Sequence, residues 1–589
     1  MRVIATAGHV DHGKSTLVRA LTGTDPDRWA EEHRRGLTID LGYAWTTLPT
    51  GETLAFVDVP GHQRFIANML AGLGPAPGVL FVVAADEGWR QQSTEHFTAV
   101  RALGIEHIVV AVTRIDLADP GPAAAQARQH LGNVPIVPVS AHTGHGLDAL
   151  RAALATLGEA LPTPVTTGRV RLWVDRVFTL KGPGTVATGT LESGRIAVGD
   201  TLTLVRAPGA AQAIVRGLQS LGEPRATVDG VARIAINLRG VTTDHLARGD
   251  TLLTPDAWHL TTTVDARLTD ASDVPEHVTA HVGTAGVPVR VRPLGGDAVR
   301  LSWAHPLPLQ AGDRLVLRDP GQHRIVSGAL VLDADPPALR RRGDAARRAA
   351  DLAGRDGRLD VATEVARRGW VHAADLVALG ADPGGLAAPG VRREGEILVA
   401  TAQWAAWARE LDAVVRAAVA ADPLQGRMPA GAAASAIGLP EGGLLGALAS
   451  EAGLELTAGH LQVPGRTADL GAAEVGLVEV ERRLSERPFA APERDELGAL
   501  GLGRREVAAA VRLGRLVDLG DMVVLGPGAP ALAMRVLAGL PQPFTTSEAR
   551  QALGTTRRVV IPLLEELDRR GWTRRIDAGH RVVVREISA

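Results

Sequence analysis

The chain has 589 residues, enough for about four domains of ordinary size. Its net charge of −2 excludes a protein that binds nucleic acid through an overall positive charge, so any basic surface has to be local. It contains no cysteine, which excludes disulfides and thiolate metal sites and agrees with a cytoplasmic protein. No apolar run is long enough to cross a bilayer, and the first residues are typical of a strand. We therefore expect no signal peptide and no membrane partner.

Only two of the 63 lysine and arginine residues are lysines, Lys14 and Lys181. Lys14 lies in Gly8-His-Val-Asp-His-Gly-Lys-Ser15, which matches the phosphate-binding pattern G-x-x-x-x-G-K-[ST]. The amide groups of such a loop face phosphate, and a compact lysine ammonium reaches between the β- and γ-phosphates where a planar guanidinium does not. A phosphate-binding loop is therefore predicted at residues 8–15. Chance explains the retention of Lys181 equally well.

Two more residues fit the metal side of such a site. Ser15 supplies a hydroxyl for Mg²⁺, and Asp58 follows an expected strand over residues 54–57 as the second ligand on that side. The phosphate loop followed by Asp58-Val-Pro-Gly61 is much more specific than the loop alone.

The first 165 residues alternate strand and helix patterns. Apolar runs over 79–83 and 108–112 are typical of buried parallel strands, which predicts a doubly wound α/β sheet with its ligand at the carboxyl ends of the strands. Asp116 follows the second run and can accept the N1–H and N2–H groups of guanine, which adenine does not offer. A backbone N–H at Ser140-Ala141 can meet the guanine oxygen. The pattern favours GTP over ATP, although an aspartate after a strand is also a common helix cap.

Residues 8–15, 36–42 and 58–62 resemble the translational GTPases, the group that contains elongation factor Tu (EF-Tu). The resemblance implies that Thr38 binds Mg²⁺ when the γ-phosphate is present and that Gly61 touches this phosphate. It further implies that His62 is catalytic and orients the attacking water once the ribosome positions it, and that a monovalent cation lies near Asp11. The complete set expected to bind GTP is Asp11, His12, Gly13, Lys14, Ser15, Thr16, Thr38, Asp58, Gly61, Thr113, Arg114, Asp116, Ser140 and Ala141, with Ser15, Thr38 and Asp58 on the metal.

The guanine motif departs from this family. The family has Asn-Lys-x-Asp where the chain has Thr113-Arg114-Ile-Asp116. Thr113 lacks a side-chain amide, so we expect a lower affinity for guanine. Arg114 keeps an apolar stem that can lie over the base, and Asp116 keeps the discriminating contact, so GTP remains the expected nucleotide.

From Val165 onward the helical pattern stops, and short β patterns over 168–178, 184–192, 201–206 and 231–238 alternate with Gly and Pro turns. This predicts two small β-barrels with a break near Thr254-Pro255. Residues 175–190 resemble the second domain of EF-Tu-like factors, whose surface receives the aminoacylated end of a tRNA. Gly184 and Gly189 would allow the terminal adenosine a close approach, although ordinary barrel turns also use glycine.

The segments Gly36-Leu-Thr-Ile-Asp-Leu-Gly42 and Asp175-Arg-Val-Phe-Thr-Leu-Lys-Gly182 narrow the resemblance to the selenocysteine-specific elongation factors, the SelB family. A selenol is ionised at neutral pH whereas a thiol mostly is not, so a selenocysteine pocket should hold cationic donors. The candidates for the aminoacyl end, each also open to ordinary surface salt bridging or turn formation, are Asp175, Arg176, Lys181, Gly184, Thr185, Arg239, Asp244 and His245.

Four hairpin patterns about 60 residues apart occupy 391–399, 454–463, 516–525 and 573–584, each after a helical pattern. Helices followed by a two-stranded wing predict four winged helices in tandem. The SelB family is similar, and the end of its array grips an mRNA hairpin. Residues 529–589 carry ten arginines against six acidic residues, which fits RNA binding but also a solvated basic face. The RNA candidates are Arg550, Arg557, Arg558, Trp572, Arg574, Arg575 and Arg581.

The expected architecture is multidomain: an α/β P-loop GTPase domain, two β-barrels and an α+β array of tandem winged helices. The expected boundaries are 1–165 for the GTP-binding domain, 166–256 and 257–338 for the barrels, and 339–405, 406–470, 471–528 and 529–589 for the winged helices.

The resemblance implies a cytoplasmic, monomeric GTPase that binds GTP, GDP and Mg²⁺. It would deliver selenocysteinyl-tRNA to the ribosome at UGA codons, recruited by an mRNA hairpin (a SECIS element). One alternative is an EF-Tu-like carrier of ordinary aminoacyl-tRNA, against which the C-terminal extension argues. The other is a GTP-switched regulator whose winged helices read duplex DNA.

Overall fold

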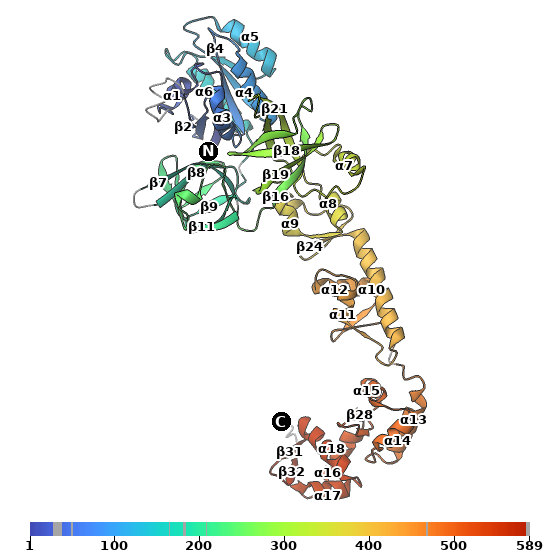
Figure 1. Cartoon of the computed structure of the whole chain (residues 1–589). Coiled ribbons are helices and arrows are strands. Elements are labelled where there is room, and N and C mark those ends of the chain that lie inside the picture. Colours follow the sequence, from blue (N-terminus) through green and yellow to red (C-terminus); the bar gives the residue numbers. More distant parts are fainter. Residues whose placement is uncertain are drawn as a thin grey trace. The chain divides into compact units, whose positions relative to one another are not determined.

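The computed structural model describes residues 1–26, 38–48, 51–163, 165–180, 184–207, 209–466 and 469–584. The chain forms two compact units, Met1–Leu398 and Val399–Ala589. Figure 1 shows their elements in chain order. The predicted fold class is confirmed: an α/β GTPase domain is followed by two closed β-barrels and a winged-helix region. Lys181 and residues 36–37 lie outside the described residues.

The N-terminal domain is built on a six-stranded sheet in the order β2-β3-β1-β4-β5-β6. All neighbouring strands are parallel except β2, which is antiparallel to β3. The carboxyl ends of the central strands therefore meet at one edge, where a doubly wound fold places its ligand. The strands are β1 (Arg2–Gly8), β2 (Gly42–Thr47), β3 (Thr53–Asp58), β4 (Gly78–Ala84), β5 (His107–Thr113) and β6 (Ile136–Pro138).

Helices cover both faces of this sheet because successive side chains of a strand point to opposite faces. Val3 and Ala5 of β1 lie in one apolar core together with the helices α3 (Ile66–Leu73), α4 (Gln91–Ala102) and α5 (Pro120–Leu131). Ile4 lies in the other core, with α1 (Lys14–Thr22) and α6 (Leu147–Ala160). Both faces are thus buried, which fixes the strand ends that carry the site.

The first barrel has the strand order β10-β15-β7-β8-β14-β11 and closes because β10 also pairs with β11. Its strands are β7 (Arg171–Leu180), β8 (Gly184–Leu191), β10 (Thr201–Arg206), β11 (Gly209–Ser220), β14 (Ala232–Arg239) and β15 (Thr251–Leu253). The short strands β9 (Arg195–Ala197) and β13 (Thr227–Asp229) pair with each other, and β12 (Glu223–Arg225) pairs with β11. The sequence did not predict β11 because alanine and glutamine are weak strand formers; two neighbouring strands hold it in place.

The second barrel closes in the order β16-β19-β18-β17-β20-β21. Its strands are β16 (Leu260–Leu268), β17 (His277–Val282), β18 (Ala285–Gly295), β19 (Ala298–Pro308), β20 (Arg314–Arg318) and β21 (Ile325–Asp333). Helix α7 (Asp344–Leu352) follows and places Leu352 in an apolar cluster with Leu294 and Leu332 of the barrel.

Buried ion pairs fix α7 to this second barrel. Arg348 of α7 is 4% exposed and donates to Asp265 at 2.7 Å and to Asp333. Asp265 also accepts two hydrogen bonds from Arg300, at 2.7 and 3.0 Å. Each buried charge therefore has a partner, and removal of one would leave another unpaired at a large cost.

The four predicted hairpins are hydrogen-bonded strand pairs. They are β23 (Val391–Glu394) with β24 (Ile397–Ala400), β26 (Glu455–Thr457) with β27 (His460–Gln462), β28 (Val517–Asp518) with β29 (Val524–Leu525), and β31 (Thr573–Arg575) with β32 (His580–Val583). A third strand joins the first, second and fourth pairs: β22 (Trp370–His372), β25 (Met428–Pro429) and β30 (Phe544–Thr545).

Helices accompany each of these small sheets. They are α8 (Val361–Arg368) and α9 (Ala373–Ala378); α10 (Thr401–Ala421), α11 (Ala430–Ala436) and α12 (Leu445–Glu451); α13 (Ala473–Glu486), α14 (Arg494–Ala499) and α15 (Arg504–Arg512); and α16 (Ala529–Ala538), α17 (Thr546–Ala552) and α18 (Arg557–Arg569). The last two groups share one apolar core, which includes Val507 and Leu563. None of the helices in the described residues combines the length and the apolarity needed to span a bilayer.

Candidate functional site

The loop between β1 and α1 has the backbone of a phosphate cradle. Asp11 and Gly13 have φ angles of 62° and 82°, and α1 begins directly afterwards at Lys14. The ammonium group of Lys14 donates to the carbonyl oxygens of Gly8 and His9, at 3.1 and 2.8 Å. The loop therefore curls around this side chain and holds its charge at the start of the helix, where phosphate binds best.

Two side chains of α4 support this loop, and no sequence pattern predicted either of them. Gln92 Oε1 accepts the Val10 N–H at 3.0 Å, and His96 Nδ1 accepts the Gly8 N–H at 3.2 Å. Burial lowers the pKa of His96 to about 3, so its imidazole remains neutral and accepts this hydrogen bond. These contacts join the loop to a helix that is distant in sequence.

The three expected metal ligands lie together. The Ser15 hydroxyl is 2.6 Å from Asp58 Oδ2 and 2.9 Å from the Thr38 hydroxyl. Thr6 donates to the other Asp58 oxygen at 2.6 Å, so this fully buried carboxylate is fixed in orientation. Oxygen donors from three separate segments converge here, as a hard divalent cation requires.

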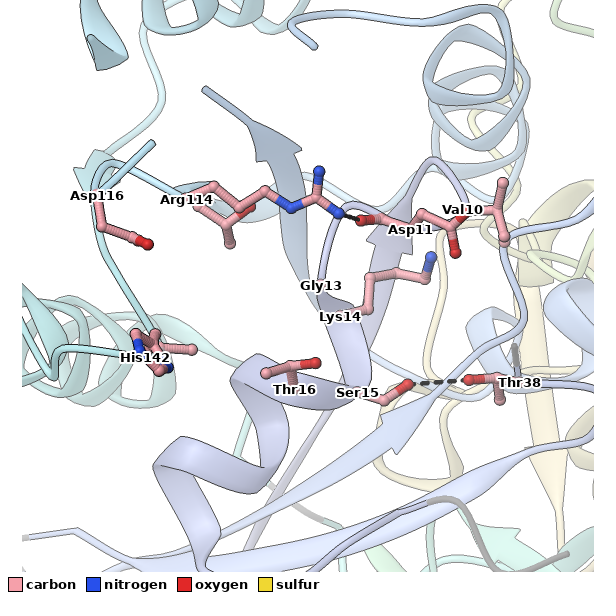
Figure 2. Close-up of a pocket in the computed structure, with 13 residues that line it drawn as sticks. Val10, Asp11, Gly13, Lys14, Ser15, Thr16, Thr38, Arg114, Asp116 and His142 are labelled. Carbon is pink, nitrogen blue, oxygen red and sulfur yellow. Dashed lines mark hydrogen bonds between the residues drawn. The ribbon is translucent and has the colours of Figure 1, made fainter. Parts of the chain in front are cut away.

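Ser15 and Thr38 lie at one end of a cavity of about 420 Å³, whose lining does not include the buried Asp58. Figure 2 shows Lys14, Ser15 and Thr38 at this end and Asp116 and His142 at the other. Eleven of the residues expected to bind GTP line the cavity: Asp11, Gly13, Lys14, Ser15, Thr16, Thr38, Gly61, Thr113, Arg114, Asp116 and Ala141. Val10 and His142 line it as well; the sequence analysis missed both, although each directly adjoins an expected residue.

Gly61 closes the phosphate end. A Cβ atom there would lie 2.6 Å from Lys14 Nζ and 2.6 Å from the Val10 nitrogen, so any larger residue would displace the loop. His62 follows and is half-buried outside the cavity lining. Its Nδ1 accepts the Arg64 N–H at 3.2 Å. A neutral imidazole held in this way carries its proton on Nε2.

The departure at the guanine motif has a structural counterpart. The Thr113 hydroxyl donates to the His12 carbonyl oxygen at 2.8 Å, which joins the end of β5 to the phosphate loop. Arg114 donates to the Asp11 carbonyl oxygen, to Asp86 at 3.0 Å and to Glu87 at 3.2 Å. A hydroxyl and a guanidinium thus anchor the loop from the side that would face the base.

Asp116 and the loop after β6 form the other end of the cavity. Asp116 is exposed, and a hydrogen bond from Ser140 holds the pKa of its carboxyl group below its usual value. Ser140 is buried, and its N–H donates to the His145 carbonyl oxygen at 2.9 Å. Of the two expected backbone donors to guanine, the Ala141 N–H is therefore the better candidate.

The His12 side chain lies beneath the loop and does not line the cavity. Its ring is fully buried, with Nδ1 3.4 Å from the Val82 carbonyl oxygen. Burial lowers the pKa of His12 to about 3, with smaller contributions from His9 and Lys14. An uncharged imidazole packed under the loop supports the shape of the loop. The backbone carbonyl of His12 accepts the hydrogen bond from Thr113 described above.

In the first barrel, Asp175 and Arg176 face the GTP-binding domain. Asp175 pairs with Arg233 and accepts the Thr188 hydroxyl at 2.7 Å. Arg176 donates to Asp40 at 2.7 Å, two residues after Thr38. Both expected pocket residues therefore take part in contacts next to the segment that carries Thr38.

The other barrel candidates that the structure describes differ in burial. Thr185 is buried, whereas Arg239, Asp244 and His245 are exposed, and His245 Nδ1 lies 2.7 Å from the Thr242 hydroxyl. Gly184 has a φ of 96° with no atom within 4 Å of a Cβ placed on it. A second cavity of about 440 Å³ adjoins Arg176, and its lining includes Tyr43, Trp45, Phe178, Gln219 and Arg233, which the sequence analysis did not select.

The arginines of the terminal winged helix form two groups: some make internal contacts and others are exposed. Arg581 is 8% exposed and donates to Asp568 at 2.9 Å, and Arg558 donates to the carbonyl oxygens of Ala491 and Pro492, at 2.9 and 3.0 Å. Arg557, Arg574 and Arg575 are exposed, and Arg550 and Trp572 are half-buried. The guanidinium of Arg570 lies 5.3 Å from the centre of the Trp572 ring, an addition to the expected set.

Three family models match the chain. They are the elongation factor Tu GTP-binding domain over residues 1–160, the selenocysteine-specific elongation factor β-barrel domain over 259–338, and the elongation factor SelB winged helix over 535–582.

Among curated proteins, the chain is 36% identical to the selenocysteine-specific elongation factor of Escherichia coli over 386 residues, 64% of this chain and 62% of that protein. It therefore spans less than two thirds of the length of this relative. It is 34% identical to elongation factor Tu 2 of Streptomyces avermitilis over 287 residues, 43% of this chain and 72% of that protein. A crystal structure of a bacterial selenocysteine-specific elongation factor matches 99% of this chain and 100% of that one, with a TM-score of 0.76 and 25% identity.

Proposed function

We propose that the chain, which belongs to the selenocysteine-specific elongation factors within the EF-Tu type of translational GTPases, carries selenocysteinyl-tRNA to the ribosome and hydrolyses GTP there. The proposal is supported above all by the 420 Å³ cavity, whose lining includes the loop before α1, Ser15, Thr38 and Asp116, with Asp58 bonded to Ser15 beside it.

The two ends of this cavity suit the two ends of GTP. The loop amides and Lys14 face the phosphates, and the Asp116 carboxylate accepts the two guanine N–H groups. The hydrogen bond from Ser140 holds the pKa of the Asp116 carboxyl group below its usual value and so favours the ionised form, which accepts hydrogen bonds. Thr113 and Arg114 hold the loop beneath the nucleotide in place of the usual Asn-Lys pair.

Ser15, Thr38 and Asp58 would hold Mg²⁺. When bound, the cation neutralises charge on the β- and γ-phosphates. Thr38 belongs to a different segment from Ser15, so its hydroxyl can report whether the γ-phosphate is present. A monovalent cation beside Asp11 is a further part of the proposal, supported only by the position of Asp11 in the cavity lining.

His62 is the proposed catalytic residue. Its half-buried ring lies just outside the cavity lining and accepts the Arg64 N–H through Nδ1, which leaves Nε2 to meet a water molecule. Gly61, which precedes it, touches the position of the γ-phosphate through its backbone. Contact with the ribosome would bring the ring toward the phosphate and so couple hydrolysis to delivery.

The aminoacyl end of the tRNA is proposed to bind between the GTP-binding domain and the first barrel. Arg176 pairs with Asp40 next to Thr38, so a change at the nucleotide can reach this surface through one ion pair. The cavity beside Arg176 offers aromatic walls, which suit a nucleobase. Its two guanidinium groups, Arg176 and Arg233, pair with Asp40 and Asp175, so an anionic side chain would have to compete with these carboxylates. Arg239, Asp244, His245, Thr185, Gly184 and Lys181 remain proposed contacts of the aminoacyl end, and none of the five described ones lines this cavity.

The mRNA hairpin is proposed to bind the terminal winged helix through its exposed arginines, with Trp572 as a stacking surface. The division of the chain into seven domains, its monomeric state and its cytoplasmic location belong to the same proposal.

Ribosome-stimulated GTP hydrolysis tests the proposed function. We expect stimulation with selenocysteinyl-tRNA and ribosomes that carry a UGA codon followed by the hairpin, and much less when the hairpin is deleted. Equal stimulation by ordinary aminoacyl-tRNA without a hairpin would favour an EF-Tu-like carrier instead. No stimulation under any of these conditions would reject a role in delivery.

A further inference from the structure

Two histidines of the phosphate loop lie close to a carboxylate from the loop between β4 and α4. His9, His12 and Glu87 each offer one ligand atom, and the three atoms lie within 4.8 Å of one another. The ring centroids of His9 and His12 are 4.9 Å apart. The lining of the nucleotide cavity includes Val10 and Asp11 but none of these three residues. The three residues, which we call the His-His-Glu cluster, therefore form a group that is separate from the nucleotide cavity.

Both imidazoles of the cluster hold a buried nitrogen that is not hydrogen-bonded. Among the described residues, neither His9 Nδ1 nor His12 Nε2 has a hydrogen-bond partner. His12 is fully buried, and its Nδ1 donates to the Val82 carbonyl oxygen at 3.4 Å, because a carbonyl only accepts. His12 Nε2 therefore carries a lone pair, and Glu87 Oε2 lies 3.8 Å away. A ring nitrogen whose partner nitrogen donates to a backbone carbonyl is oriented as metal-binding histidines are.

Glu87 keeps one of its two oxygens available. Its Oε1 accepts from Arg114 at 3.2 Å. Its Oε2 lies 3.6 Å from Arg90 Nε and 3.8 Å from His12 Nε2, and both distances are longer than a hydrogen bond. Arg114 also donates to Asp86 at 3.0 Å, so its guanidinium stays paired if Glu87 turns toward the histidines.

The charges around the cluster restrict the kind of ion that fits. Lys14, Arg90 and Arg114 are close enough to lower the pKa of a histidine in the cluster, so electrostatic attraction alone does not favour a cation here. The affinity has to come from bonds to the ligand atoms themselves. Imidazole nitrogen binds Zn²⁺ and its neighbours in the first transition series well, whereas Mg²⁺ takes oxygen ligands.

We propose that the His-His-Glu cluster binds one divalent transition-metal ion of the Zn²⁺ class. Two imidazoles and one carboxylate are a known Zn²⁺ ligand set, in which water takes the fourth position. The ion would join the phosphate loop, on both sides of Val10 and Asp11, to the loop that precedes α4. The proposed Mg²⁺ ligands are different, because Ser15, Thr38 and Asp58 offer oxygen only.

The test uses Co²⁺ as a spectroscopic substitute for Zn²⁺ on the full-length protein, without a histidine tag or nucleotide and in excess Mg²⁺. Tetrahedral Co²⁺ with nitrogen ligands absorbs visible light much more strongly than octahedral Co²⁺ with oxygen ligands. Two variants, Glu87→Gln and His9→Gln, each remove one ligand. Two controls, Glu159→Gln and His145→Gln, change exposed residues of the same domain. The controls measure surface binding, since the chain has 18 histidines.

We expect one strongly absorbing Co²⁺ per wild-type chain, and Zn²⁺ should displace it. The affinity should be at least about tenfold lower in Glu87→Gln and in His9→Gln, and unchanged in both controls. Ser15→Ala, which removes a ligand of the proposed Mg²⁺ site, should keep the absorption. Circular dichroism without metal should be the same for every variant, which establishes that they fold. Zn²⁺ should also raise the melting temperature of the wild type, because it binds the folded state.

Three results would overturn the inference. One is a wild-type protein without the strong absorption. Another is wild-type affinity in either Glu87→Gln or His9→Gln, which would assign the ion to histidines elsewhere on the surface. The third is absorption that Ser15→Ala abolishes, which would place the ion at the proposed Mg²⁺ site. Each of these results would leave the proposed role in tRNA delivery intact, because that role does not depend on the cluster.

Discussion

The nucleotide cavity and the terminal winged helix use charge in opposite ways. At the cavity, Ser15, Thr38 and Asp58 come from separate segments, and hydrogen bonds of the Ser15 hydroxyl join them, while Lys14 is held by the carbonyl oxygen of Gly8 in its own loop. In the winged helix the arginines are close in sequence, yet Arg558 and Arg581 are engaged in internal contacts. A motif with fixed spacing therefore identifies the residues of a site, whereas a local excess of charge identifies only the region in which a site lies. The experiments below test each half of this comparison.

The largest effect is expected at the catalytic step. His62→Ala should leave GTP binding unchanged, because the ring does not line the cavity, and should lower ribosome-stimulated hydrolysis by roughly 100- to 10,000-fold. Single-turnover hydrolysis with and without ribosomes measures this. Retained stimulation would remove His62 from the mechanism.

The next largest effect is expected at the phosphate end. Lys14→Ala removes a buried ammonium that would pair with phosphate and that also bonds to Gly8 and His9. GTP binding should weaken by about 3–5 kcal/mol, at least about a hundredfold. Arg19→Ala, on the exposed side of the same helix, is the matched control and should bind normally. Equal affinities for both variants in equilibrium binding would contradict the assignment of the cavity.

Acid should destabilise the cavity through its buried histidines. The pKa values of His12 and His96 are both lowered to about 3 by burial, whereas unfolded histidine titrates near 6.5. The unfolded state binds more protons between these values, so stability is complete above about pH 6.5 and is lost as the pH falls toward 3. At pH 5 each histidine should cost roughly 2 kcal/mol in the free energy of unfolding.

Denaturant titrations at pH 7 and pH 5 check this expectation. Replacement of His96 by glutamine should flatten the dependence on pH, and replacement of the exposed His145 should not. An unchanged slope for His96→Gln would mean that this imidazole is not buried in its neutral form.

The terminal winged helix should respond differently to two of its arginines. Arg557→Ala should weaken hairpin binding and reduce the salt slope by about one contact without a loss of stability, since Arg557 is exposed. Arg581→Ala should cost about 1–3 kcal/mol of stability because it removes the charged partner of Asp568, which keeps only its hydrogen bond from the Thr573 hydroxyl. Titrations with the hairpin measure the RNA affinity of each variant, and thermal melts measure its stability. If Arg581→Ala reduced only RNA affinity, the separation into exposed and internal arginines would be wrong.

The smallest effect is expected at the guanine motif. Thr113→Asn restores the residue that the family has, but Thr113 already anchors the phosphate loop through the His12 carbonyl. We expect the GTP affinity to change by less than about tenfold, the equivalent of about one hydrogen bond. A gain of several hundredfold in GTP affinity would mean that the contact between the Thr113 hydroxyl and the His12 carbonyl contributes nothing to nucleotide binding.

The sequence predicted much of this because several motifs have rigid spacing. The phosphate loop, the Asp58 segment and Asp116 all follow buried parallel strands, and parallel strands bring their carboxyl ends to one edge. The four wings were predicted from turns that interrupt an alternating pattern. Supports from distant helices were missed, among them Gln92 and His96, because a helical glutamine or histidine carries no local sign of what it contacts.

The sequence also did not predict which side chains pair with one another. The sequence suggested Arg176 for an anionic pocket and Arg558 for RNA, but each pairs within the chain. Such pairing depends on which surfaces the fold brings together, and sequence spacing does not record it. Thr113 illustrates the same limit. The sequence shows that this position lacks the side-chain amide of the family, but it does not show that the Thr113 hydroxyl bonds to the His12 carbonyl instead.

The most direct test of the central claim is protection of an aminoacyl ester. The protein with GTP is mixed with selenocysteinyl-tRNA or with seryl-tRNA on the same tRNA body, and spontaneous deacylation is followed. We expect that the selenocysteinyl ester alone is protected, because an ionised side chain meets cationic groups. Equal protection of both esters would contradict the charge-selective pocket, and protection of neither would contradict the tRNA carrier itself.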